Sequence, residues 1–353
     1  MKKVIGLVLL IALLSGCTPG SDVEVVTDLV SIPSPSHIQE QLSNILQVNA
    51  TVDVQDIDLR RLSILPCTFQ VLNAQAALDL LCSDEKIVSH EMTSTEGLGP
   101  NAEQNIYRFK SGAMLICGNT LCCYSTSDAE KLFEIIGDDI ETQFSDEDQW
   151  HNEFAFMSRQ DIEENVLDLC SRFKISAKNM EIRAIDYRSV KGKDHSQKYT
   201  WSEVDNFYYV SVFPFCGELP LSSINHGDLA DGSYMIGSTI KAIYSEKGLI
   251  YWNSNFLFQQ TKEPDLGDGI ISVYTALKSL AAKYDLLLTS ASYTITNIDL
   301  AYLPVRTGHN AYGLRPVWQF KLVEDNDEEQ RQMYFVNIDA TSGKEIRLSL
   351  IHI

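Results

Sequence analysis

Short runs in which apolar and polar residues alternate make up much of the chain, and each run predicts a β-strand with one buried face. Other segments carry apolar residues at the spacing of one helical face, which predicts amphipathic helices. The expected strands lie at residues 49–54, 67–71, 106–110, 113–117, 121–125, 180–187, 207–215, 239–244, 249–253, 292–302, 316–323, 333–339 and 344–348, and the expected helices begin near residues 74, 128, 159 and 273. The chain is therefore expected to alternate single helices with groups of short strands.

Two of the expected helices share one apolar pattern. The first follows a Ser158–Asp161 capping box. The matching stripes are Ile162, Val166, Leu169, Cys170 and Phe173 in one helix and Val273, Leu277, Leu280, Ala281 and Tyr284 in the other. Each helix is followed by several expected strands, so the two segments look like copies of one plan. The pattern predicts an α+β fold of tandem units, each with one helix packed on a small antiparallel sheet.

Changes in composition divide the chain into units. Acidic residues crowd residues 138–148, which predicts a self-repelling boundary. Pro264, Gly267 and Gly269 predict a linker further on. The expected units are an N-terminal unit at 37–140, a middle unit at 150–263 and a C-terminal unit at 268–353.

The N-terminus carries a secretion signal. Lys2 and Lys3 precede an apolar run from Val4 to Leu14, which is too short to span a membrane but has the length of a signal-peptide core. The run ends in Leu14-Ser15-Gly16-Cys17, which resembles the lipobox of bacterial lipoproteins. That resemblance implies a signal peptide at 1–16, lipid on Cys17 and a tether at 17–36, which would anchor the chain on the extracytoplasmic face of the cell membrane. An ordinary secretory signal with an accidental cysteine is the alternative.

The C-terminal unit carries a second resemblance. It reads Leu314-Arg-Pro-Val-Trp-Gln-Phe-Lys-Leu322, then an acidic loop, then Tyr334-Phe-Val-Asn-Ile-Asp-Ala-Thr-Ser-Gly-Lys-Glu-Ile346. This resembles the closing hairpin of PepSY-like domains and of YycI-type regulatory proteins, and the whole chain is similar to Firmicutes lipoproteins of unknown function. The resemblance implies cystatin-like curvature of the sheet, and it supplies no catalytic residue to carry over. A lipobox stands where YycI-type proteins have a membrane helix, so their kinase-regulating role is not transferred.

Charge and motifs exclude several classes of function. With 28 Lys plus Arg against 48 Asp plus Glu, the net charge of −20 argues against nucleic-acid binding. Nucleotide-binding loops, nucleophile elbows and zinc-ligand spacings are absent from the sequence, so we expect no cofactor and no metal. The cysteines other than Cys17 are expected to be core thiols or to form one bridge, with a redox role as the alternative; they are Cys67, Cys82, Cys117, Cys122, Cys123, Cys170 and Cys216.

Aromatic residues give the strongest candidate for a binding surface. The segment Phe207–Phe215 is apolar on both faces, so it must be covered on both sides. Each cover is either another part of the chain or a ligand. If a ligand takes part, the candidate groove for a peptide or glycan is formed by Tyr208, Tyr209, Phe213, Phe215, Trp252 and Trp318.

These features together predict a non-enzymatic cell-surface lipoprotein that binds or regulates an extracytoplasmic protein or peptide. One alternative is a cell-envelope hydrolase with dispersed carboxylates, because the sequence does not reveal their separation in the fold. Another is a solute-binding lipoprotein, although the antiparallel strand signals argue against the parallel sheets usual in that class.

Overall fold

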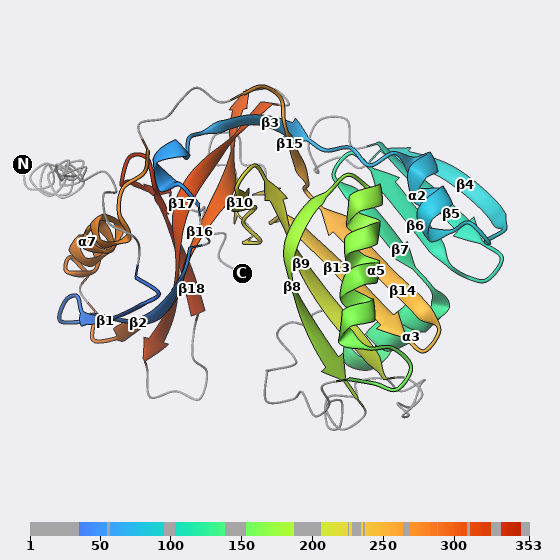
Figure 1. Ribbon diagram of the computed structural model, residues 1–353, viewed down its shortest axis with the longest axis horizontal. Helices are drawn as coiled ribbons and strands as arrows, with labels where there is room; N and C mark the ends of the chain where they lie inside the picture. Colours follow the sequence, from blue (N-terminus) through green and yellow to red (C-terminus); the bar gives the residue numbers. More distant parts are fainter. Residues whose placement is uncertain are drawn as a thin grey trace, which may run out of the picture.

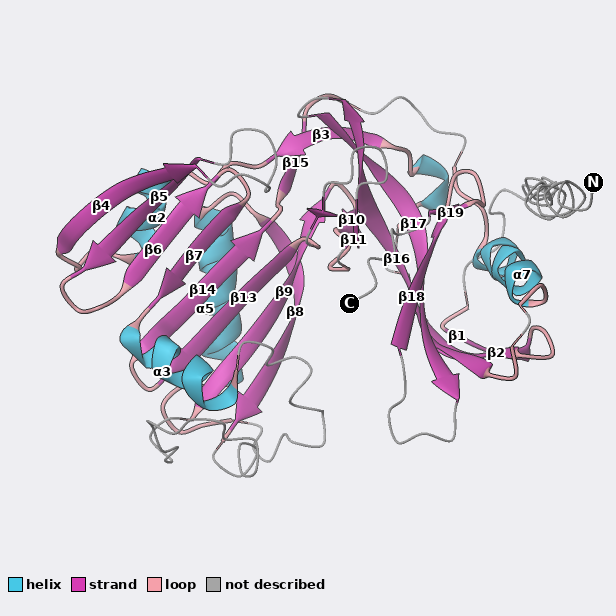
Figure 2. Cartoon of the chain, turned by 180° about the vertical axis from the view of Figure 1, so that it is seen from behind, coloured by secondary structure: helices cyan, strands magenta, loops and turns pink. Residues whose placement is uncertain are grey.

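The computed structural model describes residues 35–54, 57–94, 103–137, 153–186, 206–224, 226–227, 234–235, 237–263, 269–287, 289–308, 311–325 and 333–346. The expected signal peptide, Cys17, nearly all of the tether and the acidic boundary segment lie outside these residues, as do Pro264 and Gly267 of the linker. The described chain is mostly β-structure in two large sheets, which stand side by side in Figures 1 and 2.

The sheet that contains the C-terminal strands is called the first sheet. Its strands follow the order β1 (His37–Gln41), β2 (Leu46–Asp53), β16 (Ser292–Gly308), β17 (Ala311–Asp325), β18 (Met333–Asp339) and β19 (Glu345–Ile346), while β3 (Leu65–Phe69) pairs with β17 and β15 (Phe258–Gln260) pairs with β3. Neighbouring strands are antiparallel, except that β2 and β16 run parallel.

Helix α7 (Val273–Tyr284) covers one face of the first sheet. The hydroxyl of Ser272 begins the helix by accepting a hydrogen bond from the Thr275 N–H at 3.1 Å. Leu277 and Leu280 are completely or almost completely buried in one core with Trp318. The indole N–H of Trp318 donates to the carbonyl of Ile271 at 3.1 Å, which fixes the segment before the helix on the sheet.

The other sheet is called the second sheet, and its neighbouring strands are all antiparallel. Its order is β4 (Ile87–Ser94), β5 (Glu103–Phe109), β6 (Met114–Gly118), β7 (Leu121–Ser125), β14 (Gly248–Asn255), β13 (Thr239–Ser245), β9 (Phe207–Cys216) and β8 (Ser176–Ile185), with β10 (Leu219–Pro220) paired to the end of β9. A separate two-stranded ladder is formed by β11 (His226–Gly227) and β12 (Tyr234–Met235).

Helices cover both faces of the second sheet. They are α2 (Ala74–Leu81) and α5 (Arg159–Arg172) on one face and α3 (Ser127–Ile136) on the other, and the short η1 (Leu59–Arg61) precedes β3. Strand β9 is buried between them, since Tyr208 lies in the core with α5 and Tyr209 lies in the core with α3. At Tyr208 and Tyr209, β9 is therefore covered on both faces from within the chain.

The second sheet is inserted into the first. The chain leaves the first sheet after β3 and returns to it at β15, where Phe258 pairs with Phe69. The N–H of Gln70 donates to the carbonyl of Leu257 at 2.8 Å, so the outgoing and returning segments lie side by side, as Figure 1 shows. All strands of the second sheet come from the chain between these two segments.

The expected α+β fold of tandem units, each a helix on a small curved sheet, is wrong. Antiparallel strands do follow both helices, namely β8, β9, β10, β13 and β14 of the second sheet after α5 and β16 to β19 of the first sheet after α7. However, strands from residues 37–140 extend both groups, because β7 pairs with β14 and β2 pairs with β16. The segments 37–140, 150–263 and 268–353 therefore do not form separate sheets. The apolar periodicity showed which face of a strand is buried, but it carries no information on which strand lies beside it.

Candidate functional site

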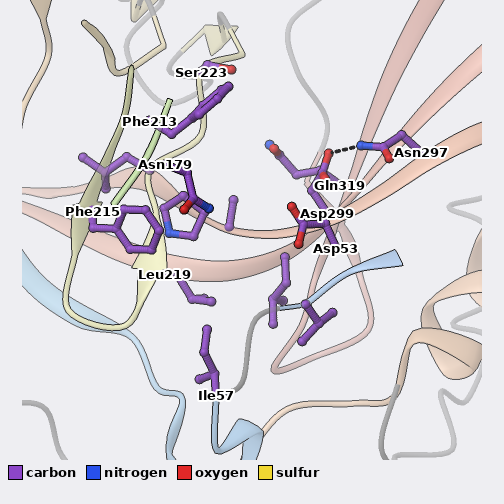
Figure 3. A pocket seen from close by; sticks show the side chains of 15 residues that line it. Asp53, Ile57, Asn179, Phe213, Phe215, Leu219, Ser223, Asn297, Asp299 and Gln319 are labelled. Atoms are coloured by element: carbon purple, nitrogen blue, oxygen red, sulfur yellow. Dashed lines mark hydrogen bonds between the residues drawn. The ribbon is translucent and has the colours of Figure 1, made fainter. Parts of the chain in front are cut away.

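A cavity of about 310 Å³ lies between the two sheets and is called the inter-sheet cavity. Strands β2, β16 and β17 of the first sheet provide one wall, and β8, β9 and β10 with the segment after β10 provide the other. It is lined by Asp53, Val54, Ile57, Asn179, Phe213, Phe215, Leu219, Pro220, Leu221, Ser223, Asn297, Asp299, Leu300, Ala301 and Gln319 (Figure 3). This volume is at the lower end of the range for small-molecule sites.

The first-sheet wall carries a polar row, which consists of Asp53, Asp299, Gln319 and Asn337. Asp299 pairs in register with Asp53 on β2 and with Gln319 on β17, and Gln319 pairs with Asn337 on β18. Directly paired residues point to the same face of a sheet, so the row faces away from α7 and toward the second sheet.

Hydrogen bonds hold part of the polar row in place. The side-chain amide of Gln319 donates to the hydroxyl of Ser222 at 2.6 Å and to the side-chain carbonyl of Asn337 at 2.9 Å. Ser222 belongs to the segment that follows β10, and its N–H donates to the carbonyl of Tyr302 at 2.8 Å. All three of these polar side chains are buried, so the network links the first sheet to the end of the second at a fixed geometry.

The environment of Asp299 disfavours its charge. Burial raises the pKa of this carboxyl, and the neighbouring Asp53 raises it further. The side-chain amide of Asn297 donates to Asp299 Oδ2 at 2.7 Å and, with the more distant Lys321, opposes the rise without cancelling it. The cavity thus holds a carboxylate whose ionised form is not fully compensated by the chain.

Aromatic rings form the facing wall. Phe213 is half-buried and Phe215 is buried, and both project from β9 on the side of the cavity opposite Asp53 and Asp299 (Figure 3). The ammonium group of Lys178 lies 4.9 Å from the ring centroid of Phe215, within cation–π distance. The cavity therefore places carboxylates and aromatic rings on opposite sides of one small volume.

The six aromatic residues expected to form a groove do not gather at one place. Phe213 and Phe215 line the inter-sheet cavity. Tyr208 and Trp252 are fully buried under α5, Tyr209 packs with the α3 core and Trp318 lies under α7. The Tyr208 hydroxyl accepts from the Phe154 N–H at 2.5 Å and donates to the Met157 carbonyl at 2.9 Å, as a core tyrosine does.

Sequence reasoning missed the polar residues of the first-sheet wall, namely the two carboxylates Asp53 and Asp299 and the neutral amide Gln319. Asp299 lies between Ile298 and Leu300 at a polar position of an alternating strand, so by itself it resembles a solvated strand residue. Its meaning depends on Asp53 being the next residue across the sheet, which only the register of β2 against β16 reveals.

Changing Asp299 to Asn is expected to stabilise the fold. The pKa of Asp299 is raised above its ordinary value of 3.8, so between these two pKa values the folded chain binds more protons than the unfolded chain. As the pH rises through this range, ionisation of Asp299 therefore lowers the free energy of unfolding. At about pH 7 the variant should melt about 2 °C higher than the parent chain, and in strong acid the two should melt alike. Thermal unfolding followed by circular dichroism measures this difference, with Asp79→Asn on the exposed side of α2 as the control. A lower melting temperature for Asp299→Asn at neutral pH would contradict the electrostatic description of the cavity.

Cysteine thiols and possible metal ligands are the other reactive groups among the described residues. Within the described ranges, no group of three or more His, Cys, Asp or Glu side chains is placed to hold a metal ion. The seven cysteines in those ranges are free thiols, and six are buried while Cys123 is half-buried. Burial raises the pKa of the Cys67, Cys82 and Cys170 thiols to about 12, which disfavours the nucleophilic thiolate. No helix in the described part of the chain is long and apolar enough to cross a membrane.

Comparison with known proteins identifies the fold but no family. No family model matches the chain, and no curated protein matches its sequence. Nine solved chains match its structure. One of them is an uncharacterized protein from Eubacterium rectale ATCC 33656, with a TM-score of 0.72 and 16% sequence identity over 89% of this chain and 94% of that chain. At this level of identity, the similarity establishes a shared fold over nearly the whole of both chains.

Proposed function

We propose that the chain is a non-enzymatic, extracytoplasmic binding protein, anchored to the membrane by lipid on Cys17, that receives a protein or peptide partner at the inter-sheet cavity. The observation that carries this proposal is the meeting of two carboxylates and two aromatic rings in one cavity between the two sheets. The residues that line the cavity include neither a histidine nor a cysteine, and Ser223 is their single hydroxyl group. This composition favours recognition over nucleophilic catalysis.

The sheet edge beside the cavity supports a peptide partner. Among the described strands, β8 pairs with β9 alone, which leaves its other side as an edge of the second sheet. Asn179 on this strand also lines the cavity. An extended segment added to β8 would therefore run past the cavity mouth and could place a side chain inside it.

A synthetic peptide array probed with the full-length labelled chain tests this function. The variant Ser223→Trp places a large side chain at the exposed rim of the cavity, and Ser89→Trp on β4 places the same side chain at the distant edge of the second sheet. The parent chain and Ser89→Trp should bind the same subset of peptides, and Ser223→Trp should lose that subset. Retention of binding by Ser223→Trp would exclude the cavity as the partner site.

A cell-envelope hydrolase is the second candidate, and it is favoured by one specific observation. Asp299 has a raised pKa and stands beside a second carboxyl, Asp53, as in pairs that divide acid and base roles. Incubation with cell-wall fragments, followed by mass spectrometry of the products, separates the two functions. Release of products by the parent chain and none by Asp299→Asn would replace the binding proposal with the hydrolase.

The anchor can be tested separately. A Cys17→Ser variant expressed with its leader is expected to incorporate no fatty acid, because the sulfur that carries the lipid is absent. Metabolic labelling with an alkyne fatty acid should mark the parent chain and leave the variant unmarked, and the parent should fractionate with membranes. Equal labelling of both chains would show that Cys17 is not the lipidated residue.

A further inference from the structure

We infer that the inter-sheet cavity recognises an organic cation, an alkylammonium or guanidinium group, which Asp53 and Asp299 would bind while Phe213 and Phe215 pack against its apolar stem. This inference rests on the proposed function and names the chemistry of the ligand.

The charge balance of the first-sheet wall favours a cationic ligand. Asp53 and Asp299 are adjacent in register, and neither forms an ion pair with any residue in the described ranges. Among the described side chains, Asn297 alone donates a hydrogen bond to the pair, and it occupies a single oxygen of Asp299. Lys321 lies on the same face of the first sheet, paired with Asn297 one row away. The carboxylate pair therefore has acceptor oxygens available for a cationic donor.

The aromatic rings of Phe213 and Phe215 on the facing wall also suit a cation. The quadrupole of an aromatic ring attracts a cation to its face. Lys178 already places its ammonium 4.9 Å from the Phe215 centroid, so this wall accommodates a positive charge in the chain itself. An anion would meet both carboxylates, and a neutral sugar could stack on the rings but would leave the charge of the partly buried Asp299 uncompensated.

The size of the cavity and the net charge of the chain favour a small cationic group. A cavity of about 310 Å³ admits one small cationic group with a short apolar stem, and it does not admit a folded surface. The net charge of −20 raises the local concentration of cations around the chain. The same group is offered by a free polyamine and by a Lys or Arg side chain of a peptide, so both sources must be measured.

Isothermal titration calorimetry with the full-length chain tests the inference. The cationic probes are 1,4-diaminobutane, for a free amine, and acetyl-Gly-Lys-Gly-amide, for a peptide side chain. The neutral probes are acetyl-Gly-norleucine-Gly-amide, which keeps the apolar stem, and methyl glucoside. Asp53→Asn and Asp299→Asn remove one negative charge each, and Asp79→Asn on α2 removes a charge far from the cavity.

We expect at least one cationic probe to bind, the affinity to fall with added salt, and each cavity variant to bind at least about tenfold more weakly while Asp79→Asn binds as the parent does. The probe that binds more tightly identifies the source of the cation. Absence of binding by both cationic probes, equal affinity for a neutral probe, or unchanged affinity in Asp299→Asn would overturn the inference. The peptide array gives a further outcome. If the peptides that Ser223→Trp fails to bind contain no basic residue, the inference of a cationic ligand is overturned, while the proposed function stands.

Discussion

Replacing Trp318 with alanine is expected to lower the free energy of unfolding by about 3–5 kcal/mol. Trp318 is fully buried in the core between α7 and the first sheet, and alanine would leave a large cavity there. The change also removes the donor to the Ile271 carbonyl, which would be left without this partner. Equilibrium denaturation in urea, followed by fluorescence and circular dichroism, measures the loss.

The matched control for Trp318 is Phe335→Ala. Phe335 is an aromatic residue of the same sheet, but it is 42% exposed, so its loss should change stability by no more than about 0.5 kcal/mol. The comparison also tests the candidate groove, which included Trp318. If Trp318→Ala unfolds at the same urea concentration as the parent and fails only in ligand binding, Trp318 is a binding residue and the core described above is incorrect.

Replacing Asp339 with alanine is expected to cost about 2–4 kcal/mol of stability. This buried carboxylate closes the turn between β18 and β19: its Oδ1 accepts from the Thr341 N–H and hydroxyl and from the Ser342 N–H, and its Oδ2 accepts from Arg315 at 2.8 Å. The variant leaves the turn donors and Arg315 without their acceptor. Arg315 is one-third exposed and can reach water, which keeps the cost below that of a fully buried pair. Urea denaturation at neutral pH measures it.

The pH dependence of this variant provides a second check. Burial raises the pKa of Asp339, but the hydrogen bonds from Thr341 and Arg315 outweigh that effect, so the pKa lies below its ordinary value of 3.8. A lowered pKa gives stability that is present above the unfolded value and is lost as pH falls through the folded value. The difference in the free energy of unfolding between the parent and Asp339→Ala should therefore be largest near neutral pH and should disappear below about pH 4. The control Asp58→Asn removes an exposed ion pair with Arg60 and should show no measurable loss of stability. A stability difference between the parent and Asp339→Ala that persists in acid would contradict the role assigned to Asp339.

The sequence predicted many elements but not their assembly. The apolar stripes of Ile162 to Phe173 and of Val273 to Tyr284 are confirmed as α5 and α7, and the two faces of Phe207–Phe215 are confirmed as the two faces of β9. Strand β4 was missed because nearly all of its residues are exposed, so no apolar alternation marks it. Local periodicity does not reveal which distant segments pair, so it could not predict that β7 pairs with β14 or that β2 pairs with β16.

The candidate site was less predictable than the fold. Phe213 and Phe215 were expected to face a groove and do line the cavity, because alternation on one strand places them together. Asp53 and Asp299 come from opposite ends of the chain, and each alone resembles a solvated strand residue. The two carboxylates become neighbours only because of the register of β2 against β16. A shift of this register by one residue would change every residue pair between the two strands.

Because the second sheet is inserted in the sequence between β3 and β15, the two sheets are expected to form in a fixed order during synthesis. β2 finds its neighbour β16 only after the intervening chain has been synthesised, whereas the strands of the second sheet are complete once residue 255 is available. Closing so long a loop is entropically costly unless its interior has already condensed. The second sheet should therefore acquire structure early, and the first sheet should assemble last. A chain truncated before β16 would lack the first-sheet wall of the inter-sheet cavity.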